Sequence, residues 1–125
     1  MEQRELQVLI VDDHIPLRKM IRSMLEVYAD LQVVGEASNG LEGMILVEQL
    51  RPSIVLMDIN MPEMNGVEAT GQIKLHHPET IVIGLSVNAS VENQQAMKQA
   101  GAVRLIPKEA APEQLYDAIQ DAVSS

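Results

Sequence analysis

The chain has 125 residues, enough for one domain that buries its core without metal or disulfide support. Its net charge of −9 excludes the basic surface that binds nucleic acid backbones, and the lack of cysteine excludes disulfides, thiolate metal sites and cysteine nucleophiles. The N-terminus, MEQRELQVLI, is charged and has only a short apolar run, so we expect no signal peptide, no membrane contact and a cytoplasmic location.

Short apolar runs recur along the chain, each bounded by Gly, Pro, Asp or Asn, which is typical of buried strands. The runs cover residues 6–11, 31–37, 53–57, 80–85 and 102–106. Between the first two runs, apolar residues recur at helical spacing from Leu17 to Tyr28. This spacing predicts a helix with one apolar face.

Two further helical patterns follow the fourth and fifth runs. Segment 91–101 ends at Gly101, which suits the left-handed residue after a helix, and we expect this helix to be the most exposed. Its thin apolar stripe consists of Val91, Met97 and Ala100. The last helix begins near Pro112, a residue suited to a first helical turn. Its apolar positions are Leu115, Ala118, Ile119, Ala122 and Val123.

The alternation of five strands with five helices predicts the fold class. Parallel strands need crossover connections, and these are right-handed, so both faces of the sheet become covered by helices. We therefore expect a single α/β domain over residues 1–125, built as a three-layer, doubly wound sheet of five parallel strands. No internal repeat or low-complexity tract interrupts the pattern.

Acidic residues stand at the ends of two predicted strands: Asp12 and Asp13 after the first, and Asp58 after the third. Ligands bind at the carboxyl ends of parallel strands, so these carboxylates should share one pocket. Like charges this close need a counter-ion, and Mg²⁺ (or Mn²⁺) prefers such oxygen ligands, with the Asn60 backbone carbonyl as a further candidate. Taken alone, the Asp pair would also suit a helix N-terminus, a reading that Asp58 disfavours.

Two more polar side chains belong to the same edge of the predicted sheet. Ser86 follows the fourth run and Lys108 follows the fifth. A lysine after a strand is usually a solvated surface residue, but beside acids it can neutralise a carboxylate and contact a phosphoryl oxygen. Ser86 can donate a hydrogen bond to another phosphoryl oxygen. Asp58 is then a candidate nucleophile that accepts a phosphoryl group as an acyl phosphate.

Four motifs carry this chemistry: LIVDDH (9–14), VLMDINMPEMNGVEA (55–69), IGLS (83–86) and GAVRLIPKEAAPEQL (101–115). In order and spacing they resemble the receiver domain of two-component response regulators. The resemblance implies a flavodoxin-like fold with strand order 2-1-3-4-5 and Mg²⁺-dependent phosphorylation of Asp58 by a histidine kinase or a histidine phosphotransfer protein. It implies self-phosphotransfer and autodephosphorylation rather than metabolic catalysis. The last motif, together with VVGEASNG (33–40), looks most like receivers followed by a helix-turn-helix output domain, although related receivers also end hybrid histidine kinases.

The resemblance also assigns roles to the residues of the acidic pocket. Asp13 and Asp58 would bind the metal directly, together with the carbonyl of Asn60, and Asp12 would act mainly through water. Asn60 and Asn88 lie where such domains tune the lifetime of the acyl phosphate.

Around the acceptor, the resemblance implies that Ser86 senses the phosphoryl group and that Lys108 pairs with it. Pro62 and Gly66 would shape the loop that follows the acceptor strand. Phosphorylation would then shift the balance between two conformations by giving Ser86 and Lys108 a new charged partner.

Three positions depart from the family pattern. Leu105 stands where Tyr or Phe is usual, three residues before Lys108, so a switch must use backbone shifts or aliphatic repacking. Val87 is bulkier than the usual Ala or Gly, and we expect it to narrow access to Asp58 and slow phosphorylation by small donors. Glu109 replaces a frequent Pro, which leaves the isomer of the preceding peptide bond open.

The same residues bear on two alternative functions. An FMN-binding flavodoxin shares the topology, but this chain offers DDHIP instead of a hydroxyl-rich and glycine-rich phosphate loop, and it has no Trp or Phe. A phosphorylation-independent, receiver-like interaction scaffold stays open because of Leu105. We expect no direct contact with nucleic acid, and an output domain or dimer partner would lie outside this chain.

Overall fold

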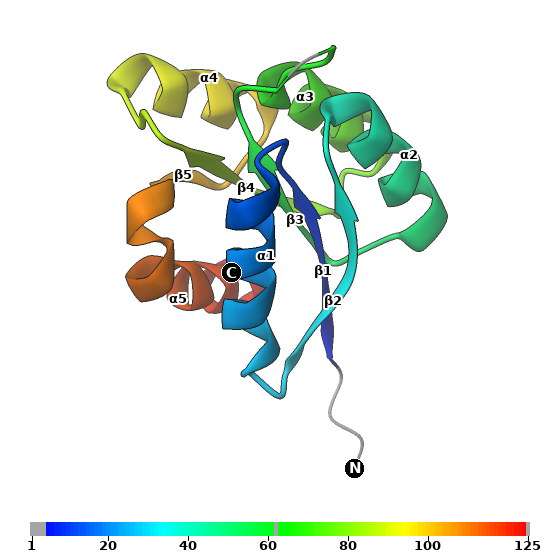
Figure 1. The fold of residues 1–125 in the computed structure, drawn as a ribbon. Coiled ribbons are helices and arrows are strands. Elements are labelled where there is room, and N and C mark those ends of the chain that lie inside the picture. Colours follow the sequence, from blue (N-terminus) through cyan, green and yellow to red (C-terminus); the bar gives the residue numbers. More distant parts are fainter. Residues whose placement is uncertain (1–4, 62, 125) are drawn as a thin grey trace.

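A computed structural model describes residues 5–61 and 63–124 (Figure 1). Five parallel strands form one sheet in the order β2-β1-β3-β4-β5, which confirms the expected fold. The strands are β1 (Leu6–Val11), β2 (Leu31–Ala37), β3 (Ile54–Asp58), β4 (Ile81–Ser86) and β5 (Arg104–Pro107). The helices are α1 (Ile15–Glu26), α2 (Gly40–Leu50), α3 (Gly66–His76), α4 (Val91–Ala100) and α5 (Ala111–Ser124), with a 3₁₀ turn η1 (Lys108–Ala110) before α5.

Helices cover both faces of the sheet, which gives three layers (Figure 1). Helices α1 and α5 pack on one face, over a core that includes Ile10, Leu56 and Ile83. Helices α2, α3 and α4 pack on the other, over alternate strand residues such as Leu9 and Val55. Because the central strands are buried on both faces, they read in the sequence as continuous apolar runs.

The last three strands each begin and end later than the apolar runs predict. The ladder of β3 and β4 continues through Asp58, which pairs with Leu85, and that of β4 and β5 continues through Ser86, which pairs with Pro107. The apolar pattern stops before these polar residues, but the backbone pairing does not. Two candidate site residues, Asp58 and Ser86, are therefore fixed by the sheet itself.

Side-chain caps start the three helices on one face. Asn39, Asn65 and Ser90 each accept a hydrogen bond from the backbone N–H three residues later, at distances of 2.8, 2.9 and 3.1 Å. Each cap satisfies a backbone donor that has no partner within the helix, and this defines where α2, α3 and α4 begin.

Helix α4 buries only Met97, which agrees with its expected exposure. The predicted apolar stripe is wrong at Val91, which is 65% exposed in the first turn, because Met97 alone fills the space over the sheet. Gly101 ends the helix with φ 116°, as predicted. None of the helices in the two described ranges has the length and apolar character that crossing a bilayer requires.

Candidate functional site

The three predicted acids meet at the carboxyl edge of the sheet. Asp12 follows β1 directly, and Asp58 is the last residue of the neighbouring strand β3. One carboxylate oxygen from each of Asp12, Asp13 and Asp58 lies within 4.8 Å of the others. Asp12 and Asp58 are buried, whereas Asp13 is exposed. The cluster is therefore a pocket that opens to solvent at Asp13.

Lys108 reaches this pocket from the start of η1. Its Nζ lies 2.9 Å from Oδ2 of Asp12 and 3.2 Å from Oδ1 of Asp58, so one cation bridges the two buried carboxylates. Burial lowers the pKa of Lys108, but the two carboxylates raise it more, and the net pKa is above its usual value. At this position the ammonium of Lys108 offsets part of the negative charge of the two buried carboxylates.

One lysine does not balance three acids. Burial raises the pKa of Asp58, the charge of Asp12 raises it further, and Lys108 offsets this only partly, so the pKa is about 7. Oδ2 of Asp12 pairs with Lys108 but has no aligned hydrogen-bond donor within the described ranges. A cluster of carboxylate oxygens with unbalanced charge fits the ligands that Mg²⁺ prefers.

The hydroxyl of Ser86 is hydrogen-bonded to the backbone of the loop that follows β4. It is buried at the end of β4, where Oγ donates to the carbonyl of Asn88 at 2.9 Å and accepts from the backbone N–H of Asn88 at 3.0 Å. The expected hydrogen bond from Ser86 to a phosphoryl oxygen stays a prediction. The backbone of the β4–α4 loop satisfies this hydroxyl, whereas Val87 and the side chain of Asn88 face solvent.

The loop after β3 is held against the acceptor strand by a glycine. The N–H of Gly66 donates to the carbonyl of Ile59 at 2.8 Å, and a Cβ at Gly66 would collide with the backbone carbonyl of Asp58. Only glycine permits this approach of α3 to β3. Asn60 is exposed two residues after Asp58, and Pro62 lies outside the described residues.

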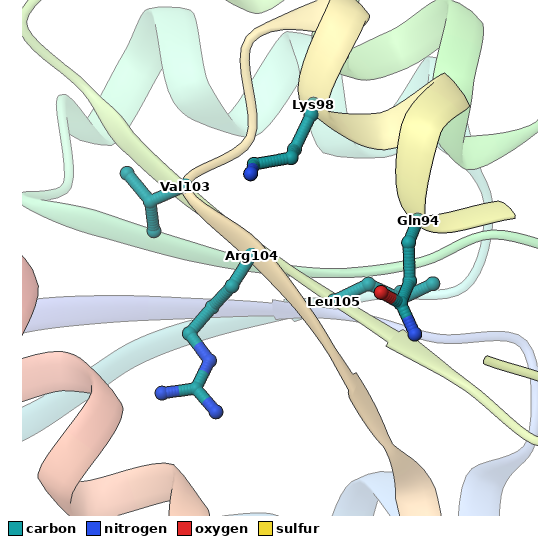
Figure 2. Close-up of a pocket in the computed structure, with 5 residues that line it drawn as sticks. All are labelled: Gln94, Lys98, Val103, Arg104 and Leu105. Atoms are coloured by element: carbon teal, nitrogen blue, oxygen red, sulfur yellow. The ribbon is translucent and has the colours of Figure 1, made fainter. Parts of the chain in front are cut away.

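Leu105 is buried between α4 and β5. A Cβ on Gly84 would lie 2.8 Å from both Leu105 Cδ1 and Met97 Cε, so these two side chains occupy the space above that glycine. A hollow of about 300 Å³ lies beside Leu105 (Figure 2), where Lys98 reaches toward β5 and Arg104 points away from α4. The Lys108–Glu109 peptide bond is trans, as are all peptide bonds in the described part of the chain.

Sequence reasoning missed Arg18. Its Nη1 donates to the backbone carbonyl of Asp12, one of the three clustered acids, at 2.6 Å. Its Nε donates to Glu36 on β2 at 2.8 Å. Spacing along the chain carries no signal for this contact, because the partners lie on different elements that only the fold brings together.

Comparisons with known proteins agree with this geometry. The family model for the response regulator receiver domain matches residues 8–120. The uncharacterized transcriptional regulatory protein YhcZ of Bacillus subtilis (strain 168) is 37% identical over 110 residues, covering 88% of this chain and 51% of that protein. The nitrate/nitrite response regulator protein NarL of Escherichia coli (strain K12) is 34% identical over 122 residues, covering 98% and 56%. The chain therefore spans about half the length of these curated relatives.

Solved structures give the same result. The response regulator domain of Thermotoga maritima CheB superposes with a TM-score of 0.91 at 29% identity, covering 98% of both chains. A LuxR-family two-component response regulator from Aurantimonas sp. SI85-9A1 has a TM-score of 0.91 at 27% identity, covering 96% of this chain and 86% of that one. With its acidic pocket at the carboxyl edge of a 2-1-3-4-5 sheet, this chain belongs to the receiver domain family of two-component response regulators.

Proposed function

We propose that residues 1–125 form a single receiver domain that accepts a phosphoryl group on Asp58 from a phosphohistidine and later hydrolyses it. The observation that carries this proposal is the bridge from Lys108 to Asp12 and Asp58 within a cluster of three carboxylates. An acyl phosphate forms when a carboxylate displaces a leaving group from phosphorus, and a fixed cation beside the acceptor stabilises the charge that develops.

The transfer is a displacement at phosphorus. A carboxylate oxygen of Asp58 forms the new P–O bond, the P–N bond of the phosphohistidine breaks, and the imidazole leaves with the electron pair. Lys108 is placed to pair with the transferred phosphoryl oxygens because it already lies 3.2 Å from Asp58. The chain activates only its own carboxylate, which makes it a switch rather than an enzyme for external substrates.

Asp13 and Asp58 would hold Mg²⁺ or Mn²⁺ directly, together with the backbone carbonyl of Asn60, and Asp12 would complete the acidic site. On the family pattern, Asp12 acts mainly through water. When bound, the ion supplies positive charge that offsets the carboxylates and the phosphoryl oxygens. The excess of acidic over basic groups in the pocket supports this assignment.

Ser86 would signal phosphorylation by exchanging its contacts with the Asn88 backbone for a phosphoryl oxygen. This exchange would move the β4–α4 loop and bias two conformations. Leu105 would follow by aliphatic repacking against Met97, because it has no ring to rotate. Val87, Asn60 and Asn88 border the acceptor as candidate controls of access and of acyl phosphate lifetime.

Receiver domains of this family work with histidine kinases, and a kinase or a histidine phosphotransfer protein is the proposed donor. An output domain or a dimer partner outside this chain would read the switch. A cytoplasmic location belongs to the same proposal, because the donor's phosphohistidine is made from ATP. No observation favours the phosphorylation-independent scaffold, since the acids and Lys108 are assembled in one pocket.

Transfer of label from a phosphorylated histidine phosphotransfer protein tests this function. We expect the wild type to become labelled with Mg²⁺ and to stay unlabelled with EDTA. The Asp58→Asn variant should not label, whereas Asp117→Asn, which removes an exposed carboxylate on α5, should label like the wild type. Labelling of Asp58→Asn would show that the acceptor is another residue.

A further inference from the structure

We propose that Arg18 is a positioning residue for the metal and phosphoacceptor pocket, an inference that rests on the proposed function. Its guanidinium donates from Nη1 to the backbone carbonyl of Asp12 at 2.6 Å. The side chain of Arg18 is 12% exposed, so this hydrogen bond is largely shielded from water. A charged donor to a carbonyl in such surroundings fixes the direction of the peptide.

The bonded peptide joins two of the three acids. The carbonyl of Asp12 and the N–H of Asp13 belong to the same peptide plane, so its rotation would move both carboxylates. On the other side, the N–H of Asp12 donates to the carbonyl of Ala37 at 3.0 Å, and Oδ1 of Asp12 accepts from the N–H of His14 at 2.8 Å. Arg18 completes this set as the donor to the Asp12 carbonyl.

Glu36 holds Arg18 in place. It lies next to Ala37 on β2, is 10% exposed, and accepts from Arg18 Nε at 2.8 Å and from Arg22 Nη1 at 2.7 Å. Burial raises the pKa of Glu36, but the hydrogen bonds from Arg18, Arg22 and Lys19 lower it to about 2. Glu36 therefore remains charged at neutral pH and keeps the guanidinium of Arg18 aimed at Asp12.

Arg22 is the matched control for Arg18, because it also attaches α1 to Glu36 on β2 but does not position the Asp12 peptide. It pairs with the same carboxylate as Arg18 and also with Glu26 at 3.1 Å, but within the described ranges it forms no bond to Asp12. Removing either arginine takes one positive charge and one Glu36 partner from the same helix. Only the Arg18 substitution frees the Asp12 carbonyl.

The test compares Arg18→Met with Arg22→Met in the folded protein, by calorimetric titration with Mg²⁺ and by the NMR amide signal of Asp13 without metal. We expect Arg18→Met to weaken Mg²⁺ binding about tenfold or more, as loss of an outer partner of a metal site does. It should also shift the Asp13 amide signal. Arg22→Met should bind Mg²⁺ within about twofold of the wild type and leave that amide signal in place, because its site geometry is intact.

If Arg18→Met does not fold, the same Mg²⁺ titration and NMR measurement are made on Arg18→Lys. Lysine keeps the positive charge but lacks the guanidinium fork that holds Glu36 and the Asp12 carbonyl through two nitrogens, so we expect Mg²⁺ affinity between those of the wild type and Arg18→Met. Equal Mg²⁺ affinity and an unmoved Asp13 amide in the Arg18 variant that folds would overturn the positioning role.

The two failures are distinguishable. A wild type that binds Mg²⁺ but takes no phosphoryl group would refute the proposed function while the Asp13 amide and the Mg²⁺ titrations still decide the role of Arg18. A wild type that is phosphorylated, with Arg18 and Arg22 variants alike in Mg²⁺ affinity and amide signals, would refute only the positioning role.

Discussion

Gly66 sets a steric limit on the acceptor site at the scale of single residues. A Cβ at this position would lie 2.8 Å from the carbonyl carbon of Asp58 and from Cα of Ile59, both of which are backbone atoms. Backbone cannot move aside as the end of a flexible side chain can. The first residue of α3 and the last residue of β3 are thus in contact, and the loop between them has no slack at this point.

We therefore expect Gly66→Ala to lower the free energy of unfolding by about 1–3 kcal/mol and to displace Asp58. Urea unfolding measures the first effect and phosphorylation rate the second. Gly71→Ala is the matched control, since it lies in the same helix and a Cβ there meets nothing within 4 Å. That substitution should stabilise the helix by about 0.5–1 kcal/mol. Equal effects of the two substitutions would contradict the steric account.

Individual site residues differed in how far the sequence revealed them. Acids and a lysine at strand ends are readable because the strand rule places their elements at one edge. The partner of Ser86 was not readable, because a backbone carbonyl and N–H two residues away satisfy the hydroxyl and leave no trace in residue types. Arg18 was missed for a related reason, since its acceptor is again a main-chain oxygen.

At the scale of elements, the junction of α4 and β5 is built from aliphatic side chains. Leu105 and Met97 fill the space above Gly84 on β4, so all three elements share one contact. The sequence showed that Leu105 stands where an aromatic is usual, but not which side chain would lie beside it. Met97 takes that place, since a long, flexible side chain can occupy the space that a glycine leaves open.

Truncation of this contact should cost stability. We expect Leu105→Ala to lower the free energy of unfolding by about 2 kcal/mol or more, because it removes buried methyl groups and leaves a cavity. Val103→Ala, at an exposed position two residues earlier, should change it by less than about 0.5 kcal/mol. Denaturant unfolding of both variants measures the two free energies of unfolding. If Leu105→Ala lowered that free energy no more than Val103→Ala does, Leu105 would have no packing role.

The order and type of the elements were predictable because strands buried on both faces leave apolar runs and helices leave periodic stripes. Their ends were less predictable. Strand β3 extends to Asp58 because backbone pairing with Leu85 outlasts the apolar pattern. Helix α4 has no buried apolar stripe because only Met97 packs on the sheet. A single buried residue leaves no helical periodicity in the sequence.

At the scale of the whole molecule, two groups give the metal-free protein opposite responses to pH. The pKa of Asp58 is raised from 3.8 to about 7, so the folded state holds a proton that the unfolded state loses. Stability from this group is therefore lost as pH rises through that interval. The pKa of Glu36 is lowered from 4.5 to about 2, so its contribution is present above pH 4.5 and lost as pH falls toward 2.

We expect the metal-free wild type to become less stable between about pH 4.5 and pH 7, where the folded state keeps the Asp58 proton that the unfolded state has lost. Mg²⁺ should reverse the loss, because it binds the ionised carboxylates and its affinity rises with pH. Urea unfolding in EDTA and in Mg²⁺ measures both effects, with Asp58→Asn as the control that removes the titrating group. A wild type and an Asp58→Asn variant with parallel pH dependence would contradict the raised pKa.

Whether Asp58 carries an acyl phosphate is tested most directly by measuring the intact mass of the protein. The protein is first incubated with Mg²⁺ and either acetyl phosphate or a phosphohistidine donor. We expect one added phosphoryl group in the wild type, lost on treatment with hydroxylamine and absent both with EDTA and in Asp58→Asn. A phosphoryl adduct on Asp58→Asn, or none from any donor on a wild type that binds Mg²⁺, would contradict it, and the second result would favour the phosphorylation-independent scaffold.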